Sequence, residues 1–348
     1  MAATINALPF ELVEQILQLA VADVDLSSSS AAISSRATFV RQCSLVSRTF
    51  RSPAQAVLWS SLRIQSPVVA RRLLASPVLG QYGTHELDLV GVHAGVEGLS
   101  GSTASRVLGK LRGIQWLRLA DFGRLSGRVL QNRNLAGLRI LILMTSFPDK
   151  PATLSALTFP FHLRSLSLYN RSYPPSFLSR LFTTSAHSLR SLTLLTGSSS
   201  PTYYALVACF PRVAPNLRHL SLQHRPSPAL VEQFAVLTSL SHLECHFAVD
   251  LPAVLDALPS PSTGASALRH LTIELDYNLA EMSTTLVERL QDSASVLSGL
   301  KKLSIPRAPA PQDFREFGGQ RLLELCEEKG VDVEIGAVVA WRTRSLLD

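Results

Sequence analysis

A six-residue pattern of alternating leucines recurs along most of the chain and limits what the chain can fold into. The pattern is L-x-x-L-x-L, and its clearest copies read LRSLSL, LRSLTL, LRHLSL and LRHLTI. Eleven strict or loose copies lie at 59–64, 84–89, 114–119, 138–143, 163–168, 189–194, 217–222, 240–245, 268–273, 300–305 and 331–335. Alternation of apolar and polar residues predicts that each copy is a short strand with one buried face.

The segments between the copies have helical spacing. Residues 176–188 place Phe177, Leu178, Leu181 and Phe182 on one helix face, and 281–299 show the same spacing. Strands that alternate with helices indicate a parallel sheet built one unit at a time. No single unit can bury its own apolar face, so neighbouring units must stack into a solenoid.

This pattern resembles the leucine-rich repeat, L-x-x-L-x-L-x-x-N. The final asparagine is missing, and its place is taken by Phe122, Ser146, Arg171, Gly197, Arg225, Ala248 and Asp276. The copies are also unevenly spaced, from 23 residues between Leu220 and Leu243 to 32 between Leu271 and Leu303. The resemblance implies an α/β fold in which 63–348 form an irregular leucine-rich-repeat solenoid with a curved parallel sheet.

The first 62 residues carry helical patterns instead of the repeat. The sequence LPFELVEQILQLA opens the first helical segment, a Ser-rich stretch covers 25–37, and a second helical segment is expected over 38–62. The ordered motifs LPFELVEQIL, CSLVSRTF and LWSSL resemble the F-box, a small helical domain that docks on the Skp-type adaptor of cullin–RING ubiquitin ligases. The residues expected to contact the adaptor are Leu8, Pro9, Leu12, Val13, Ile16, Leu17, Leu45, Val46 and Trp59.

The resemblance implies a substrate-recognition subunit of a Skp–cullin–F-box ligase, with the repeats holding an unidentified target protein. Two alternatives remain open at this point. The N-terminal helices could be a cap on the repeats of a leucine-rich-repeat scaffold. The chain could also be a nucleic-acid-binding solenoid that uses the arginines after the first leucine of each copy, such as Arg164, Arg190, Arg218 and Arg269.

The residues that alternate with the leucines are expected to face solvent and to contact the target. The candidates are Trp116, Arg118, Ile140, Ile142, Met144, Tyr169, His219, His242, Glu244 and His270. The apolar members suggest a protein contact surface, or a surface that the F-box or the C-terminal tail covers. Histidines on three neighbouring strands could suggest zinc, but ligands on parallel strands diverge, and we expect no metal and no cofactor.

The absence of catalytic motifs argues for a binding protein and against catalysis. The chain carries a net charge of +7, yet its basic residues do not form runs interleaved with aromatics, so charge alone does not indicate nucleic acid. Phosphate-binding glycine motifs, GxSxG, HExxH and paired CxxC are absent from the sequence, so we do not expect an enzyme. Scattered cysteines and the lack of a long apolar run indicate a cytoplasmic or nuclear protein that does not cross a membrane.

Overall fold

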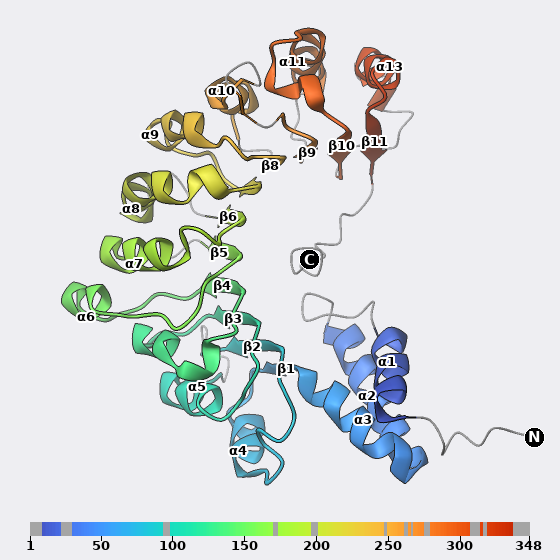
Figure 1. Ribbon diagram of the computed structural model, residues 1–348, viewed down its shortest axis with the longest axis vertical. Coiled ribbons are helices and arrows are strands. Elements are labelled where there is room, and N and C mark those ends of the chain that lie inside the picture. The colour runs from blue at the N-terminus through green and yellow to red at the C-terminus, as the bar shows by residue number, and fades with distance from the viewer. Residues whose placement is uncertain are drawn as a thin grey trace, which may run out of the picture. The chain divides into compact units, whose positions relative to one another are not determined.

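Each copy of the leucine pattern forms one strand in the structure, a computed structural model of the chain. It describes residues 9–21, 30–92, 98–169, 173–195, 201–246, 249–260, 264–265, 267–274, 279–306, 314–315 and 319–336. The chain divides into two compact units, the first comprising Met1–Pro148 with Phe159–Phe161 and the second Asp149–Thr158 with His162–Asp348. Figure 1 shows that in each unit the strands follow one another in chain order, with the helices that connect them along one side.

The strands of both units are parallel and in register at the middle leucine of each copy. In the first unit they are β1 Ser61–Ile64, β2 Glu86–Val90, β3 Trp116–Ala120 and β4 Ile140–Met144. In the second they are β5 Ser165–Tyr169, β6 Ser191–Leu195, β7 His219–Leu222, β8 His242–Cys245, β9 His270–Ile273, β10 Lys302–Ile305 and β11 Asp332–Ile335. Leu62 lies opposite Leu87, and Leu220 opposite Leu243, so the predicted strands and their common register are confirmed.

Helices and short 3₁₀ turns connect the strands. The first unit contains α1 Phe10–Ala20, α2 Ser30–Val46, α3 Arg48–Ser60, α4 Pro67–Ala75, α5 Gly101–Leu108, η2 Gly127–Gln131 and η3 Arg133–Leu135. The second contains α6 Pro151–Ser155, α7 Pro175–Ser185, α8 Pro201–Cys209, η4 Phe210–Arg212, η5 Ala214–Asn216, α9 Pro228–Val231, η6 Glu232–Val236, α10 Leu251–Ala257, α11 Leu279–Gln291, η8 Val296–Gly299 and α13 Gln320–Glu328. The mixture of helix types makes the repeat irregular, as its unequal spacing predicts.

Local sequence sets where several of these helices begin. Proline stands at the first helical position of α4, α7 and α9, where its missing N–H costs no hydrogen bond. Ser100 and Asp250 cap α5 and α10, because their side-chain oxygens accept hydrogen bonds from the backbone N–H groups of Thr103 and Ala253. The predicted helix over 281–299 is in fact shorter, since α11 ends at Gln291 and a separate 3₁₀ turn follows.

The core of the second unit lies between its sheet and its helices. The inward leucines of the strands are buried, and aromatic side chains from the helices fill the space behind them. Phe177 and Phe182 of α7 are fully buried, and the rings of Phe210 and Phe234 pack with their centroids 5.7 Å apart. Burial of one such side chain contributes about 1.5–3 kcal/mol, so stacked repeats supply the stability that a single repeat lacks.

The helices α1–α3 have a small core of their own. It contains the buried residues Val13, Leu17, Val21, Val40, Ala54 and Val57, with Cys43, Phe50 and Leu58 packed against it. The region differs from the prediction in two ways. Ser47 caps a new helix by accepting a hydrogen bond from the N–H of Phe50, so 38–62 is not one helix. The Ser-rich stretch is partly helical, because α2 begins at Ser30, while 22–29 lie outside the described residues.

The turn at Phe122 lacks the consensus asparagine and is held by another hydrogen bond. In the first unit Phe122 is buried, and its backbone carbonyl accepts a hydrogen bond of 2.9 Å from the Thr145 hydroxyl. A side-chain hydroxyl from the next repeat thus bonds a backbone carbonyl at this turn. The positions Arg171, Gly197, Ala248 and Asp276 lie outside the described residues.

Candidate functional site

Helix α1 carries two apolar faces with different surroundings. Val13 and Leu17 are buried in the core of α1–α3, whereas Leu12 and Ile16 are 41% and 47% exposed. The two sets are offset by one residue, which is about 100° around a helix. The expectation that Val13 and Leu17 contact a partner is therefore wrong, because their side chains hold the three helices together.

Other exposed apolar residues lie on α1 and at the end of α2. Leu45 and Val46 are 76% and 75% exposed, Pro9 is exposed and Trp59 is half-buried, while Leu8 lies outside the described residues. The sequence analysis did not include Leu19, which is 76% exposed and extends the row of Leu12 and Ile16. Its spacing of three residues from Ile16 is the signal that could have identified it. We call Leu12, Ile16, Leu19, Leu45 and Val46 the exposed apolar set.

The open face of the first unit's sheet differs from the expectation. Trp116 and Ile140 are only 7% and 1% exposed, so the prediction that they present an exposed apolar cluster is wrong. They are direct neighbours in the register of β3 and β4, and side chains on adjacent strands cover one another. Ile142, Met144 and Arg118 are half-buried, and in the second unit Tyr169 is half-buried as well.

A buried carboxylate lies on this same face and was missed by the sequence analysis. Asp88 is fully buried between Arg63 and Arg118, and each guanidinium approaches its Oδ2 atom at 3.3 Å. Burial raises the pKa of the Asp88 carboxyl, and the two guanidinium groups oppose that shift. The signal was available, because the three residues occupy the same position in consecutive copies of the pattern.

The second unit places its predicted histidines side by side. His219, His242 and His270 are direct neighbours on β7, β8 and β9. Their ring centroids are 6.1 Å apart for the first pair and 4.1 Å for the second, with the rings edge to face. Burial lowers the pKa of His219 and of His242 to about 4, and the pKa of His270 is lowered too. The column is therefore uncharged at neutral pH and offers hydrogen-bond donors and acceptors.

Glu244 lies beside this column and is 4% exposed. Its Oε1 accepts a hydrogen bond of 3.4 Å from Gln223, while its Oε2 is buried without a hydrogen-bond partner. Burial raises the pKa of Glu244 to about 7; hydrogen bonds from Ser221 and Gln223 oppose this shift, and the nearby Glu274 carboxylate adds to it. We call His219, Ser221, His242, Glu244, His270 and Thr272 the polar face.

The thiol that follows Glu244 on β8 belongs to the core. Cys245 follows Glu244 but points into the core, and burial raises the pKa of its thiol well above the usual value. A thiolate and the neighbouring His246 therefore do not form a catalytic pair. Groups of three or more side chains placed to hold a metal ion do not occur in the part of the chain that the structure describes.

The basic positions after the first leucine form a row in the second unit. Arg218 and Arg269 are exposed, while Arg164 and Arg190 are half-buried. The Arg190 guanidinium donates to the backbone carbonyl of Asn216 at 3.3 Å, so part of its hydrogen-bonding capacity holds the loop. Arg190 of this row therefore has a structural role, whereas Arg218 and Arg269 face solvent.

Comparison with known proteins adds little to this description. No family model matches the chain, and no curated protein matches it. Among solved structures, the chain is similar to an internalin from Listeria monocytogenes with 15% identity, over 76% of this chain and 79% of that one, at a TM-score of 0.28. That similarity assigns no function. The helices in the described ranges are all too short or too polar to span a lipid bilayer.

Proposed function

We propose that this chain is a substrate-recognition subunit of a Skp–cullin–F-box ubiquitin ligase. In this proposal α1–α3 form an F-box that docks on the Skp-type adaptor, and the repeats bind a target protein. The chain makes no bonds itself but raises the effective concentration of the target near the ligase. It would act in the cytoplasm or nucleus. The proposal rests on the F-box-like sequence motifs together with the exposed apolar set.

The exposed apolar set is the observation that carries the proposal. A three-helix region that already has its own core leaves Leu12, Ile16, Leu19, Leu45 and Val46 in solvent. Helices that served only as a cap would be expected to turn such side chains towards the repeats. Covering a large apolar side chain stabilises a complex by about 1.5–3 kcal/mol, so a few of them suffice for an anchor in a partner groove.

Co-purification with the Skp-type adaptor tests the proposal. The variant Leu12→Asp with Ile16→Asp places two charges in the exposed apolar set, where folding does not require apolar side chains. The matched control is Gln15→Asp with Gln18→Asp, which adds the same charges to other exposed positions of α1. We expect wild type and control to retain the adaptor and the Leu12/Ile16 variant to lose it. If the wild-type chain retains no adaptor, the helices are a cap and the ligase proposal is wrong.

A nucleic-acid-binding solenoid is a second candidate, favoured by the basic row of the second unit. Arg164, Arg190, Arg218, Arg269 and Lys301 occupy the same position in five repeats, and backbone hydrogen bonds of 2.8–2.9 Å connect successive repeats there. This candidate predicts binding to random-sequence DNA that weakens steeply with salt. DNA binding that is unchanged in the Arg218→Gln with Arg269→Gln variant would rule out the nucleic-acid candidate.

A further inference from the structure

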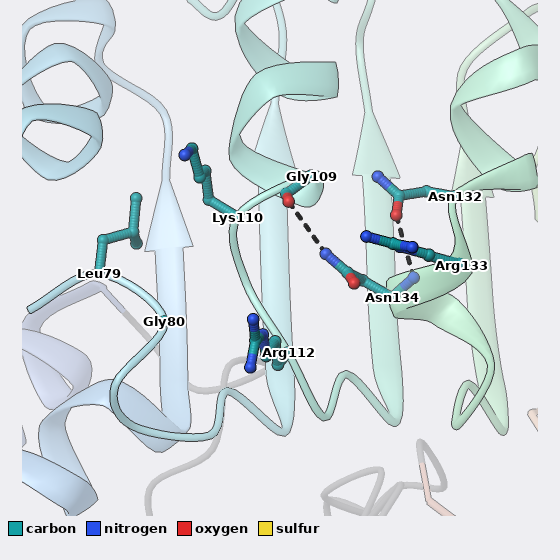
Figure 2. A pocket seen from close by; sticks show the side chains of 8 residues that line it. All are labelled: Leu79, Gly80, Gly109, Lys110, Arg112, Asn132, Arg133 and Asn134. Carbon is teal, nitrogen blue, oxygen red and sulfur yellow. Dashed lines mark hydrogen bonds between the residues drawn. The ribbon is translucent and has the colours of Figure 1, made fainter.

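The loops that precede the strands of the first unit enclose a polar hollow of about 300 Å³. Three consecutive repeats contribute to it, and Figure 2 shows the side chains that surround it. Its lining is Leu79, Gly80, Gly109, Lys110, Arg112, Asn132, Arg133 and Asn134. The lining contains three cationic side chains and no acidic one.

Hydrogen bonds between loops fix the backbone that carries these cations. The Asn134 side-chain amide donates to the carbonyl of Gly109 at 3.0 Å and to that of Leu108 at 3.2 Å. Its backbone N–H donates to the Asn132 side-chain oxygen at 3.0 Å, as the dashed lines in Figure 2 show. Gly80 has φ +83, and a Cβ there would lie 2.8 Å from the Lys110 carbonyl oxygen, so only glycine permits this approach. The three loops therefore form a defined wall.

The cations of the hollow have no carboxylate partner. Lys110, Arg112 and Arg133 are exposed, and none of them pairs with an acidic side chain within the described ranges. Like charges that line one hollow repel one another, and an anion in the hollow would reduce that repulsion. The Asn132 amide nitrogen is near Gly109 and can donate to an anion as well.

We propose that this hollow binds a phosphoryl group, presented as a phosphorylated serine or threonine of a partner protein. A phosphoryl group carries close to two negative charges at neutral pH and three acceptor oxygens. Guanidinium groups bind such oxygens in a planar, two-pronged geometry, and an ammonium adds a third charge from any direction. A single hollow fits one phosphoryl group better than the continuous track of a nucleic acid strand. The inference deepens the target-binding role proposed for the repeats and rests on it.

The test uses the full chain immobilised on resin and three probes. These are a degenerate peptide library with a fixed central phosphoserine, the same library with serine, and a random-sequence single-stranded DNA. The variant is Lys110→Gln with Arg112→Gln, and the matched control is Arg106→Gln with Arg128→Gln, which removes the same charge from exposed positions outside the hollow. Thermal melting verifies that all three proteins are folded.

We expect wild type and control to retain the phosphoserine library over the serine library, and the Lys110/Arg112 variant to bind at least about tenfold more weakly. Retention should also fall between about pH 7.5 and pH 5, because phosphate loses its second charge near pH 6. A phosphate-induced change in the NMR signals of the Asn132 and Asn134 amides in wild type would support the same site.

Three results would overturn the proposal. They are equal retention of both libraries, equal loss in variant and control, or DNA bound through Lys110 and Arg112 at least as strongly as phosphopeptide. Adaptor retention by the same preparations reports on the F-box separately. A wild-type chain that retains the adaptor but does not prefer the phosphoserine library refutes only this inference, and a wild-type chain that retains the phosphoserine library but no adaptor refutes only the ligase proposal.

Discussion

Glu244 provides a sharp test of the electrostatics of the polar face. Its carboxyl is almost fully buried, and its Oε2 has no hydrogen-bond partner. A carboxylate in this setting is less stable than the neutral acid, and Glu274 nearby adds repulsion. Glu244→Gln keeps the shape and the hydrogen bond from Gln223 while removing the charge, so we expect the variant to be more stable than wild type at neutral and higher pH.

The magnitude follows from the shifted pKa. Folding raises the Glu244 pKa from 4.5 to about 7, and at roughly 1.4 kcal/mol per pKa unit this corresponds to about 3 kcal/mol. Because the folded-state pKa is the higher one, the protonated carboxyl favours folding fully below pH 4.5, and this contribution is lost as the pH rises through about 7. The stability of the Gln variant relative to wild type should therefore grow by about 3 kcal/mol between pH 4 and pH 8.5.

Urea unfolding followed by circular dichroism at several pH values measures this difference. The buried histidines are present in both proteins, so their titration cancels in the comparison. The control is Glu334→Gln on β11, whose carboxylate accepts a hydrogen bond of 2.6 Å from Lys302 and has a lowered pKa. Because the Glu334 side chain is 39% exposed, the Glu334→Gln variant should lose less than about 1 kcal/mol of unfolding free energy at neutral pH. It should not become more stable than wild type at high pH. A Glu244→Gln effect that is the same at pH 5 and pH 8.5 would refute the reasoning.

Two further predictions concern the first unit. Asp88→Ala leaves two half-buried guanidinium groups without their shared carboxylate. We expect the free energy of unfolding in urea to fall by about 2–3 kcal/mol, which is less than for a fully buried pair because the guanidinium groups are partly exposed. An unchanged free energy of unfolding would mean that the cluster contributes nothing to stability. Gly80→Ala places a Cβ against the Lys110 carbonyl at a left-handed φ and should cost at least about 1–2 kcal/mol. It should also weaken phosphopeptide retention, whereas Gly123→Ala, where a Cβ meets no atom within 4 Å, should leave that retention unchanged.

The strands and their register could be predicted from the sequence because they depend on a local pattern that repeats. Alternation fixes which side chains face the core, and a shift of one residue would expose every leucine. This constraint holds even for the loose copies, as the strands at Glu86 and Asp332 show. The helical connections carry a weaker constraint, so a break such as the one at Ser47 depends on a single capping hydrogen bond.

The burial of outward-facing residues could not be predicted in the same way. Alternation gives the direction of a side chain but not the size of its neighbours on adjacent strands. Trp116 is buried and has a large side chain, Ile140, directly beside it in the register. On α1 the apolar residues cover more than one face, and periodicity alone does not say which face is inside. The core of the three helices selects Val13 and Leu17 and leaves Leu12 and Ile16 outside.

The same burial determines how the polar face can recognise a partner. Burial lowers the pKa of His219 and His242 to about 4, so both are neutral at pH 7, where Glu244 is only partly ionised. In the target-binding role proposed for the repeats, the face would therefore select a partner by the geometry of hydrogen bonds, since a polar group that finds no partner there loses its hydration without compensation. Full charges lie instead on exposed positions such as Arg218 and Arg269, on the loops before the strands. If the repeats bind a target as proposed, the exposed arginines would supply long-range attraction and the polar face would supply close-range selection.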